Sequence, residues 1–331
     1  MQPLLLVSYG APERQEDVIP FLNNLFAGKT VPVERFAAAV QKYERFAATT
    51  GHYSPLNSEC RKLIAALQKE WQQVGHNPPS IYWGNLFWHP LLTDTVAEMA
   101  REGVKRAVCF ATSAFDSPSG NQRYADALES ARQAIGVTAP ILEKLPLPFD
   151  HPLFIEAQTE RLLESLHLAN TPAHILFSAH SIPLADAARC HYVAQLQTAC
   201  RAVIEKSGTP LSWELVYQSR SGAAELWLGP DIKERIRELA ATGRCQSVIV
   251  APIGFFCENM ETEYDLDIEI GESCAKLGLA FFRSKAVGAM SQICRLLSTQ
   301  IELDHFKNSD HHNHRKRQPT AKVEGVPKNG P

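Results

Sequence analysis

Short apolar runs alternate with longer amphipathic stretches along most of the chain. Many of these runs are apolar on successive residues, which is typical of strands covered by helices on both faces. The predicted strands are Leu4–Ser8, Ser80–Gly84, Ala107–Ser113, His174–Ser178, Glu214–Gln218, Ser247–Ile253 and Leu279–Phe282. The predicted helices are Gln15–Phe26, Ser58–Gln73, Leu92–Glu102, Asn121–Ile135, Pro152–Leu166, Ala185–Glu205, Pro230–Ala241, Glu258–Leu277 and Met290–Leu303. This repetition predicts an α/β fold with parallel sheets.

A Pro-rich segment, Leu145–Pro152, is the best candidate for a domain boundary, because it would divide the chain into two α/β halves of similar size. The apolar pattern stops at Asp304, and we expect the polar residues 304–331 to form a disordered tail. The HHNH tract at 311–314 could bind a metal weakly, but its composition favours a solvated tail.

The composition of the chain argues against several functional classes. Of its 331 residues 45% are hydrophobic, and the net charge is −3, so the basic excess of a nucleic-acid-binding protein is missing. No apolar run approaches the roughly 20 residues that a membrane-spanning helix needs, and the N-terminus does not resemble a signal peptide. None of the eight cysteines stands in a CxxC pair, which favours reduced thiols. We therefore expect a soluble, cytoplasmic protein.

Three predicted strand ends resemble one another: VSYGAP at Val7–Pro12, SAHSIP at Ser178–Pro183 and APIGFF at Ala251–Phe256. In open α/β sheets, ligands bind at the carboxyl ends of strands, so function is expected there. His180 and Tyr9 lie at two of these ends. Each is also explained by burial alone, as a packed histidine or as a tyrosine with its hydroxyl paired.

The segment CENMETEYDLDIEIGES follows the third strand end and is unusually acidic. On an α-helix with about 100° per residue, its carboxylates fall within an arc of about 80°. These carboxylates are Glu258, Glu261, Asp265, Glu269 and Glu272. A solvated acidic face is the ordinary explanation, but the position at the mouth of a sheet favours a site for a divalent cation. Histidine with carboxylates is a plausible ligand and base set for Fe²⁺, and many other divalent ions would fit.

Motifs for other chemistry are missing from the sequence. There is no GxxxxGK[ST] phosphate-binding loop, no GxGxxG after the first strand and no GxSxG nucleophile elbow. The sequence therefore lacks the motifs that are expected of kinases, dehydrogenases and hydrolases.

The same segments resemble the ferrochelatase family, whose members insert Fe²⁺ into a porphyrin. The resemblance extends from Leu4 to about Ile301. It is carried by LLLVSYGAPERQEDVIPFL, YSPLN, YWGN, FATSAF, LFSAHSIP, VYQSRSG, WLGPDI and APIGFFCENMETEYDLD. It implies two Rossmann-like domains with parallel sheets, related by a pseudo-two-fold axis, around a porphyrin cleft. The first would comprise residues 1–150 with a crossing helix at 288–303, and the second residues 151–287.

The resemblance also implies roles for individual residues. His180 matches the active-site histidine and proton acceptor, and Glu261 matches the glutamate opposite it. Tyr264, Asp265, Asp267 and Glu269 match an acidic ridge behind that glutamate. Tyr9 matches a tyrosine that approaches the metal from the other face of the ring, and Ser54, Tyr124 and Trp227 match positions that line the pocket. The implied metal contacts are His180, Glu261, Tyr9, Asp265 and Glu269. Iron could enter along the ridge or past Tyr9, and the sequence does not choose between these routes.

The sequence departs from the family at several points. Asn259 stands where many members have histidine, and the segments that carry basic residues toward the propionates are less basic at Leu25–Lys29 and Leu86–Phe87. The TSAF and QSRSG segments favour coproporphyrin III over protoporphyrin IX as the substrate. Ser119-Gly120-Asn121 replaces an SGC segment, and no cysteine follows Cys294, so no iron–sulfur cluster is expected. We also expect a monomer without an apolar lip for membrane docking.

Three functional hypotheses follow from the sequence. The first is a ferrochelatase, a lyase that forms nitrogen–metal bonds with Fe²⁺ as the substrate metal and makes coprohaem or haem. The second is a non-catalytic tetrapyrrole- or metal-binding protein of the same fold, and the third is a cobalt or nickel chelatase. The presence of both His180 and Glu261 favours the first, because simple binding needs no base.

Overall fold

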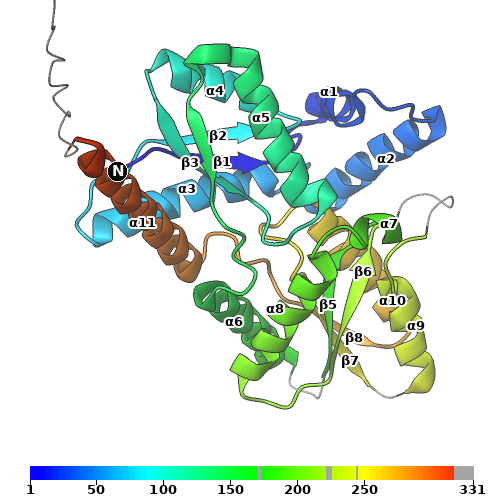
Figure 1. Ribbon diagram of the computed structural model, residues 1–331. Coiled ribbons are helices and arrows are strands. Elements are labelled where there is room, and N and C mark those ends of the chain that lie inside the picture. The colour runs from blue at the N-terminus through cyan, green and yellow to red at the C-terminus, as the bar shows by residue number, and fades with distance from the viewer. Residues whose placement is uncertain (170–172, 221–225, 244, 317–331) are drawn as a thin grey trace, which may run out of the picture.

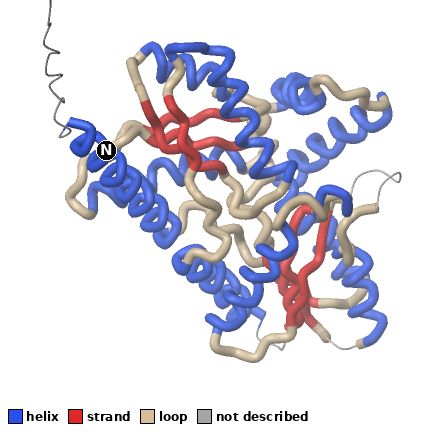
Figure 2. The backbone as a smooth tube through the Cα atoms, viewed as in Figure 1, coloured by secondary structure: helices blue, strands red, loops and turns tan. Residues whose placement is uncertain are grey.

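The computed structural model describes residues 1–316 except 170–172, 221–225 and 244, and of residues 304–316 it describes the backbone only. It contains two four-stranded parallel sheets, each with helices on both sides (Figures 1 and 2). The predicted α/β class with parallel sheets and two Rossmann-like units is therefore confirmed.

The two sheets repeat one topology. The first has the strand order β2-β1-β3-β4 and the second β6-β5-β7-β8, so each half places its own second, first, third and fourth strands in that order. The first comprises β1 (Leu4–Ser8), β2 (Ile81–Asn85), β3 (Arg106–Ala111) and β4 (Ile141–Lys144). The second comprises β5 (Ala173–His180), β6 (Trp213–Gln218), β7 (Ser247–Ala251) and β8 (Ala280–Arg283). The central strands β1 and β7 are buried along their whole length, as their unbroken apolar runs predict.

Helices connect the strands of each sheet. In the first half they are α1 (Gln15–Phe26), α2 (Val33–Thr50), α3 (Leu56–Gln73), α4 (Leu92–Arg101), the π-helix η1 (Pro118–Gln122), α5 (Arg123–Ile135) and the 3₁₀-helix η2 (Gly136–Thr138). In the second they are α6 (Pro152–Ala169), α7 (Leu184–Ala187), α8 (Tyr192–Ser207), α9 (Ile232–Thr242), the π-helix η3 (Glu261–Ile270), α10 (Gly271–Lys276) and α11 (Ser291–Lys316).

Several elements differ from the prediction. Helix α2 and the short edge strand β4 were not predicted; β4 has only four residues, none fully buried, so it carries little apolar signal. The predicted helix Ala185–Glu205 is two helices, α7 and α8. Between them the backbone N–H of His191 donates to Asp116 Oδ2 at 3.1 Å, a tertiary hydrogen bond that replaces a helical one.

The final helix is longer than predicted. Helix α11 continues to Lys316, so the expectation of disorder from Asp304 is wrong for its first residues. Residues 304–316 contain neither proline nor glycine, and Pro319 is the next strong helix breaker. Residues 317–331 lie outside the described part of the chain. Helix α11 packs against both α3 and α6, and thereby joins the two halves (Figure 1).

Most buried apolar residues form one core that spans both sheets. It includes Leu6 of β1, Leu63 of α3, Phe177 of β5, Ile249 of β7 and Leu297 of α11. Helices α1 and α2 have a separate small core of Val18, Phe21, Leu22 and Tyr43. The α1–α2 hairpin is therefore a satellite unit beside the main body, with its own apolar contacts.

A close approach in the second half fixes the strand end that carries His180. The backbone N–H of Gly254, in the turn after β7, donates to the carbonyl of Ser178 in β5 at 3.1 Å. A Cβ atom on Gly254 would lie 2.6 Å from the Cβ of Ala179, closer than real Cβ atoms approach. Only glycine fits here, and the turn that leads into η3 can therefore lie directly on β5.

Replacing Gly254 by alanine should therefore destabilise the protein. We expect Gly254→Ala to cost about 1–3 kcal/mol of unfolding free energy, the usual cost of overpacking a core. Gly271→Ala is the matched control, because its Cβ would meet Phe281 at an ordinary 3.6 Å and its backbone is helical. Urea unfolding followed by circular dichroism measures both; an unchanged midpoint for Gly254→Ala would contradict the argument.

Candidate active site

His180 and Glu261 face each other at the carboxyl end of the second sheet. His180 is the last residue of β5, paired in register with Gln218 of β6, and thus belongs to the strand. Its Nδ1 lies 3.4 Å from Glu261 Oε2 at the start of η3. Both side chains remain partly open, at 34% and 43% exposure, so a ligand can reach them.

Electrostatics holds this pair in its charged form. Burial lowers the pKa of His180, but the negative charges of Glu261 and Asp265 outweigh that effect and the pKa is raised above its ordinary value. Burial tends to raise the pKa of Glu261, yet the imidazole of His180 brings the pKa below its usual range. Both shifts favour an imidazolium beside a carboxylate near neutral pH.

The acidic segment is not the α-helix that its spacing suggested. Residues Glu261–Ile270 form a π-helix, η3, and α-helical geometry resumes at Gly271. A π-helix has wider turns than an α-helix, so residues spaced by four no longer share one face. The prediction of five carboxylates on a single face is therefore wrong.

Each of the other four carboxylates has its own cation. Asp265 contacts Lys42 at 2.5 Å, Glu269 contacts Lys233 at 2.7 Å and Glu272 contacts Arg45 at 3.0 Å. Glu258 pairs with the buried Arg283 at 2.9 Å. Within the described residues, no group of three His, Cys, Asp or Glu side chains is arranged to hold a metal ion. The structure thus brings His180 and Glu261 together but does not gather Asp265 and Glu269 with them.

A strained residue supports Asp265. Ser219 directly follows β6 and has φ 62°, in the left-handed region that non-glycine residues rarely adopt. Its hydroxyl donates to Asp265 Oδ2. Burial, together with the charge of Glu261, raises the pKa of Asp265 in spite of Lys42. Backbone strain of this kind is often found at functional sites.

Tyr9 lies in the first half, directly after β1. Its hydroxyl donates to the carbonyl of Ser119 at 2.8 Å and accepts from Arg123 Nη1 at 3.2 Å. Burial raises the pKa of Tyr9, and the charge of Glu261 raises it further while Arg123 lowers it. Tyr9 and Glu261, which belong to different halves, are thus close enough to interact electrostatically.

The three predicted pocket residues have different surroundings. Ser54 is nearly buried, and its hydroxyl accepts a hydrogen bond from the backbone N–H of Leu56. Tyr124 is 3% exposed and meets the Tyr9 ring edge-on at 5.8 Å, so it supports Tyr9 from behind. Trp227 is half-buried and forms an antiparallel bridge with Pro183, three residues after His180.

Several buried polar atoms near the strand ends have no hydrogen-bond partner. They include Gln218 Oε1 and the indole Nε1 of Trp227. Leaving such atoms unpaired costs free energy, and each one in a native structure calls for an explanation. A polar ligand between the two halves would supply the missing partners.

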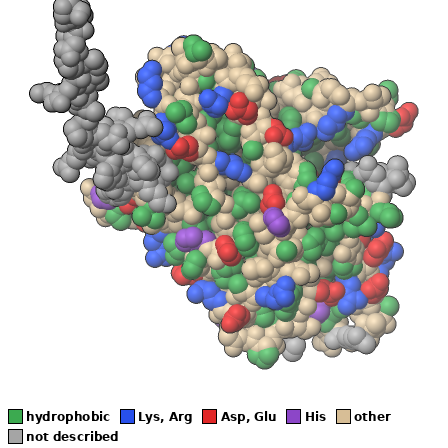
Figure 3. Space-filling view, in the orientation of Figure 1, with side chains coloured by type: hydrophobic (Ala, Val, Ile, Leu, Met, Phe, Trp, Pro, Cys, Tyr) green, Lys and Arg blue, Asp and Glu red, His purple; other side chains and the backbone are tan. Residues whose placement is uncertain are grey.

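The sequence reasoning missed the basic residues that reach the site from the first half. Lys42 and Arg45 of α2 lie over the ring of Tyr264 at 4.8 and 5.6 Å, in addition to the ion pair of Lys42 with η3 and that of Arg45 with α10. Figure 3 shows Lys and Arg side chains gathered over α1 and α2 at the upper right. The buried Tyr43 and Phe46 of α2, three residues apart, are the helical signal that could have revealed this helix.

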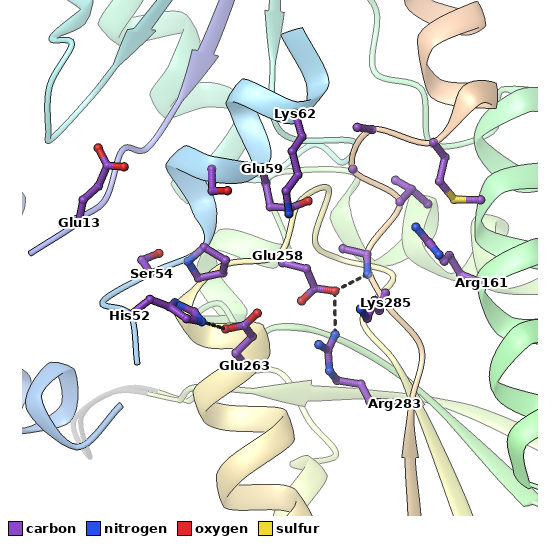
Figure 4. A pocket seen from close by; sticks show the side chains of 17 residues that line it. Glu13, His52, Ser54, Glu59, Lys62, Arg161, Glu258, Glu263, Arg283 and Lys285 are labelled. Atoms are coloured by element: carbon purple, nitrogen blue, oxygen red, sulfur yellow. Dashed lines mark hydrogen bonds and ion pairs between the residues drawn. The ribbon is translucent and has the colours of Figure 1, made fainter. Parts of the chain in front are cut away.

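A second space lies behind η3. It is a cavity of about 710 Å³ lined by residues of both halves, among them Ser54, Glu59, Glu258 and Glu263 (Figure 4). Glu263 pairs with His52 of the first half at 3.3 Å, and burial raises the pKa of Glu263 to about 7. In Figure 4 Glu258 and Glu263 point toward this cavity from the same segment.

Comparisons with known proteins agree with this geometry. The ferrochelatase family model matches residues 2–304. A ferrochelatase from Rhodopirellula baltica is 40% identical over 305 residues, covering 90% of this chain and 85% of that protein. Coproporphyrin III ferrochelatases from Frankia alni and Nocardia farcinica are each 40% identical over 90% of this chain, covering 79% and 86% of those proteins.

Solved structures share the fold at lower identity. The sirohydrochlorin chelatase SirB from Bacillus subtilis subspecies spizizenii, in complex with cobalt, matches with a TM-score of 0.52 and 11% identity. The match covers 91% of this chain and 94% of that one. DR2241 from Deinococcus radiodurans, described as similar to chelatases, matches with a TM-score of 0.51 and 14% identity over 91% of this chain and 55% of that one.

The Glu258–Arg283 pair predicts how stability depends on pH. Burial tends to raise the pKa of Glu258, but Arg283, the N–H of Ala286 and the hydroxyl of Thr262 outweigh it, so the pKa is lowered from 4.5. Because the pKa of Glu258 is lower in the folded protein than in the unfolded chain, its carboxylate stabilises the fold fully at pH values above the pKa in the unfolded chain. This stabilisation is lost as the pH falls through the pKa of Glu258 in the folded protein. Glu258→Gln should cost about 3 kcal/mol near neutral pH, and the difference from the unmodified protein should shrink below about pH 4.5.

Urea unfolding at several pH values measures this effect. Glu129→Gln, which removes an exposed partner of Arg132, is the matched control and should leave stability unchanged at every pH. A constant difference between Glu258→Gln and the unmodified protein from neutral pH to below pH 4 would contradict the assignment.

Proposed function

Because the chain belongs to the ferrochelatase family, we propose that a porphyrin binds between its two halves and that His180 and Glu261 act on it during insertion of Fe²⁺. The observation that carries the proposal is the pair of His180 Nδ1 and Glu261 Oε2, 3.4 Å apart and partly exposed at the carboxyl end of the second sheet. Together with Tyr9 at the end of β1 in the first sheet, it supports a planar ligand with His180 and Glu261 on one face and Tyr9 on the other. The unpaired polar atoms of Gln218 and Trp227 support a polar ligand beside the same strand ends.

Metal insertion requires the porphyrin to lose its two pyrrole protons. At rest, the raised pKa of His180 and the lowered pKa of Glu261 favour an imidazolium–carboxylate pair, in which the histidine already holds a proton. A divalent cation that reaches Glu261 competes with the imidazolium for the carboxylate and lowers the pKa of His180. The histidine then releases its proton to solvent, and neutral imidazole accepts the two pyrrole protons one after the other, passing each to solvent. Arrival of the metal thus prepares the base.

The ridge and Tyr9 remain the two candidate routes for iron. On the side of the acidic ridge, Lys42 forms an ion pair with Asp265, so an incoming cation must displace the ammonium group of Lys42 there. On the other side, the hydroxyl of Tyr9 is held by Ser119 and Arg123 and must leave them to contact a metal. We propose the metal contacts His180, Glu261 and Tyr9, with Asp265 and Glu269 attracting the cation by charge.

We propose coproporphyrin III as the substrate. It carries four carboxylates where protoporphyrin IX carries two, and the structure offers cations on several elements around the cleft. Arg123 lies over Phe87 at 5.3 Å beside Tyr9, and Lys42 and Arg45 lie on α2. The curated relatives in Frankia alni and Nocardia farcinica carry the name coproporphyrin III ferrochelatase. In this proposal, cations on other elements take the place of the basic residues that the sequence lacks at Leu25–Lys29.

Three further features are part of the proposal. The chain functions as a monomer and in the cytoplasm, and no helix in the described ranges has the length and apolarity to cross a bilayer. It holds no iron–sulfur cluster, because Asn121 follows Gly120 where a cysteine ligand would stand and Cys294 is the last cysteine. Iron and sulfide analysis of the purified protein tests this last point.

Anaerobic metalation tests the proposed activity. The purified protein is mixed with Fe²⁺ and either coproporphyrin III or protoporphyrin IX, and the Soret band is followed. We expect metalation with a higher kcat/KM for coproporphyrin III, because more of its carboxylates find cations. Tight porphyrin binding without metalation of either substrate would instead support a non-catalytic binding protein. Activity with Co²⁺ or Ni²⁺ alone would support the third hypothesis.

Substitution of His180 tests the proposed base. His180→Ala should lower kcat by about 10²–10⁴-fold, the usual contribution of a general base, with little change in porphyrin affinity. His76→Ala is the matched control, because this histidine lies far from the site in an exposed contact with Glu302. Undiminished turnover in His180→Ala would exclude the histidine as the proton acceptor.

A further inference from the structure

We propose that Arg123 binds a carboxylate of the porphyrin on the Tyr9 side of the site, and so neutralises the positive charge that faces the incoming metal there. Arg123 is the first residue of α5, and Tyr9 directly follows β1. This inference rests on the proposed function and deepens it, because it names one residue that recognises the porphyrin and gives the two substrates an order of binding.

The guanidinium of Arg123 has no anionic partner among the described residues. Its Nη1 donates to the hydroxyl of Tyr9 at 3.2 Å, and no carboxylate in that part of the chain forms an ion pair with it. The cations of α2 differ, because Lys42 and Arg45 already pair with carboxylates at 2.5 and 3.0 Å. A half-buried guanidinium with free N–H donors can bind a carboxylate without breaking an existing ion pair.

Arg123 lines a pocket of about 790 Å³ to which the two halves contribute, with Phe87 after β2 and Asp186 of α7 in its wall. The guanidinium lies over the ring of Phe87, 5.3 Å from the ring centroid. Ser119, whose carbonyl accepts from the Tyr9 hydroxyl, lines the same pocket. The apolar part of the lining also includes Leu86, Leu91 and Leu92. Apolar walls with a guanidinium suit the edge of a planar ring that carries a carboxylate, and they place that edge beside Tyr9.

Two carboxylates line the same pocket, but each has a partner of its own. Asp126 accepts from Gln122 Nε2 at 2.9 Å, and Asp186 pairs with Arg189 at 2.5 Å. Arg123 is the cation of the described lining. The pocket therefore favours a carboxylate at Arg123 and disfavours one elsewhere, which fixes how a bound ring is oriented.

Nearby cations add to the positive potential around Arg123. Lys29 lies between α1 and α2, and its pKa is lowered first by burial and then by the charges of Arg123 and Arg35. Like charges that lie this close attract an anionic ligand from a distance, and salt weakens the attraction. The potential supports binding of a carboxylate but does not decide where the carboxylate lies. The free guanidinium in the pocket decides that.

The charge of Arg123 also acts on the metal. The guanidinium is one hydrogen bond away from the Tyr9 hydroxyl, which the proposed function assigns as a metal contact. A positive charge this close repels a divalent cation, and more strongly where water is partly excluded. A porphyrin carboxylate paired with Arg123 cancels the charge and competes with Tyr9 for the guanidinium, which loosens the hydroxyl. The porphyrin is therefore expected to bind before iron.

Porphyrin binding tests the proposed ion pair. The full-length protein is titrated with coproporphyrin III or with its tetramethyl ester, which has the same ring but no carboxylate, and porphyrin fluorescence is followed in the same detergent. Arg123→Gln should raise the Kd for the free acid by about 10–100-fold, the effect of one lost charge-assisted hydrogen-bond pair, and leave the Kd for the ester unchanged. An unchanged Kd for the free acid, or an equal rise for both ligands, would overturn the proposal.

Two further variants complete the binding test. Arg132→Gln is the matched control, because this arginine lies on the same helix and already pairs with Glu129 at 2.8 Å; it should leave both Kd values unchanged. Arg123→Lys keeps the charge but not the planar fork, so it should recover part of the affinity for the free acid. It also serves as the test variant if circular dichroism shows that Arg123→Gln folds poorly. A folded Arg123→Lys protein with the affinity of the unmodified protein for the free acid would refute the need for the fork.

The effect on the metal is measured separately, in metalation assays at saturating porphyrin. In the unmodified protein, the KM for Fe²⁺ should be about tenfold higher with the ester than with the free acid, because the ester leaves the charge of Arg123 in place. In Arg123→Gln this difference should disappear. A difference that persists in Arg123→Gln would overturn the effect on the metal.

Failure of this inference differs from failure of the proposed function. An unmodified protein that binds coproporphyrin III but does not metalate it would overturn the proposed function, and the Kd values would still test the ion pair. An unmodified protein that metalates coproporphyrin III, with a Kd that Arg123→Gln does not change, would overturn the role of Arg123 alone.

Discussion

The close packing of Gly254 on Ala179 is the constraint on which the active site depends. It lets the turn after β7 lie on the end of β5, and η3 begins from that turn. A side chain at Gly254 would push the turn outward and carry Glu261 away from His180. The geometry of the His180–Glu261 pair therefore depends on the absence of a side chain at Gly254. The charges of the pair stabilise an arrangement that backbone packing sets.

The π-helix η3 distributes its carboxylates between two compartments. Glu261 faces the cleft with His180, while Glu263 reaches the cavity behind it and pairs with His52. Asp265 turns instead toward Lys42 of α2, and Glu272 of the following helix α10 pairs with Arg45 of α2. One acidic segment thus lies beside His180 on one side and holds the α1–α2 hairpin against the second half on another. Because these contacts are ionic, salt and bound cations act on the hairpin and on the site together.

The sequence predicts the fold well where the chain is apolar and regular. The buried strands β1 and β7 and helices such as α3 follow directly from their patterns, and His180 and Tyr9 emerge from the rule that ligands bind at strand ends. The prediction of a single acidic helix face was wrong because the spacing of residues in the sequence does not distinguish a π-helix from an α-helix. The contacts of the α2 cations with the acidic segment depend on tertiary packing between distant segments, which periodicity cannot reveal.

Helix α11 gives the molecule a particular order of assembly. Its residues Ile293, Leu296, Leu297 and Ile301 belong to the same core as Leu4 and Leu6 of the first strand. During synthesis, helix α3 of the half that is made first therefore keeps part of its apolar surface uncovered until the last helix has left the ribosome. The N-terminal half is exposed to aggregation for nearly the whole period of translation, and a chain truncated before α11 would remain in that vulnerable state.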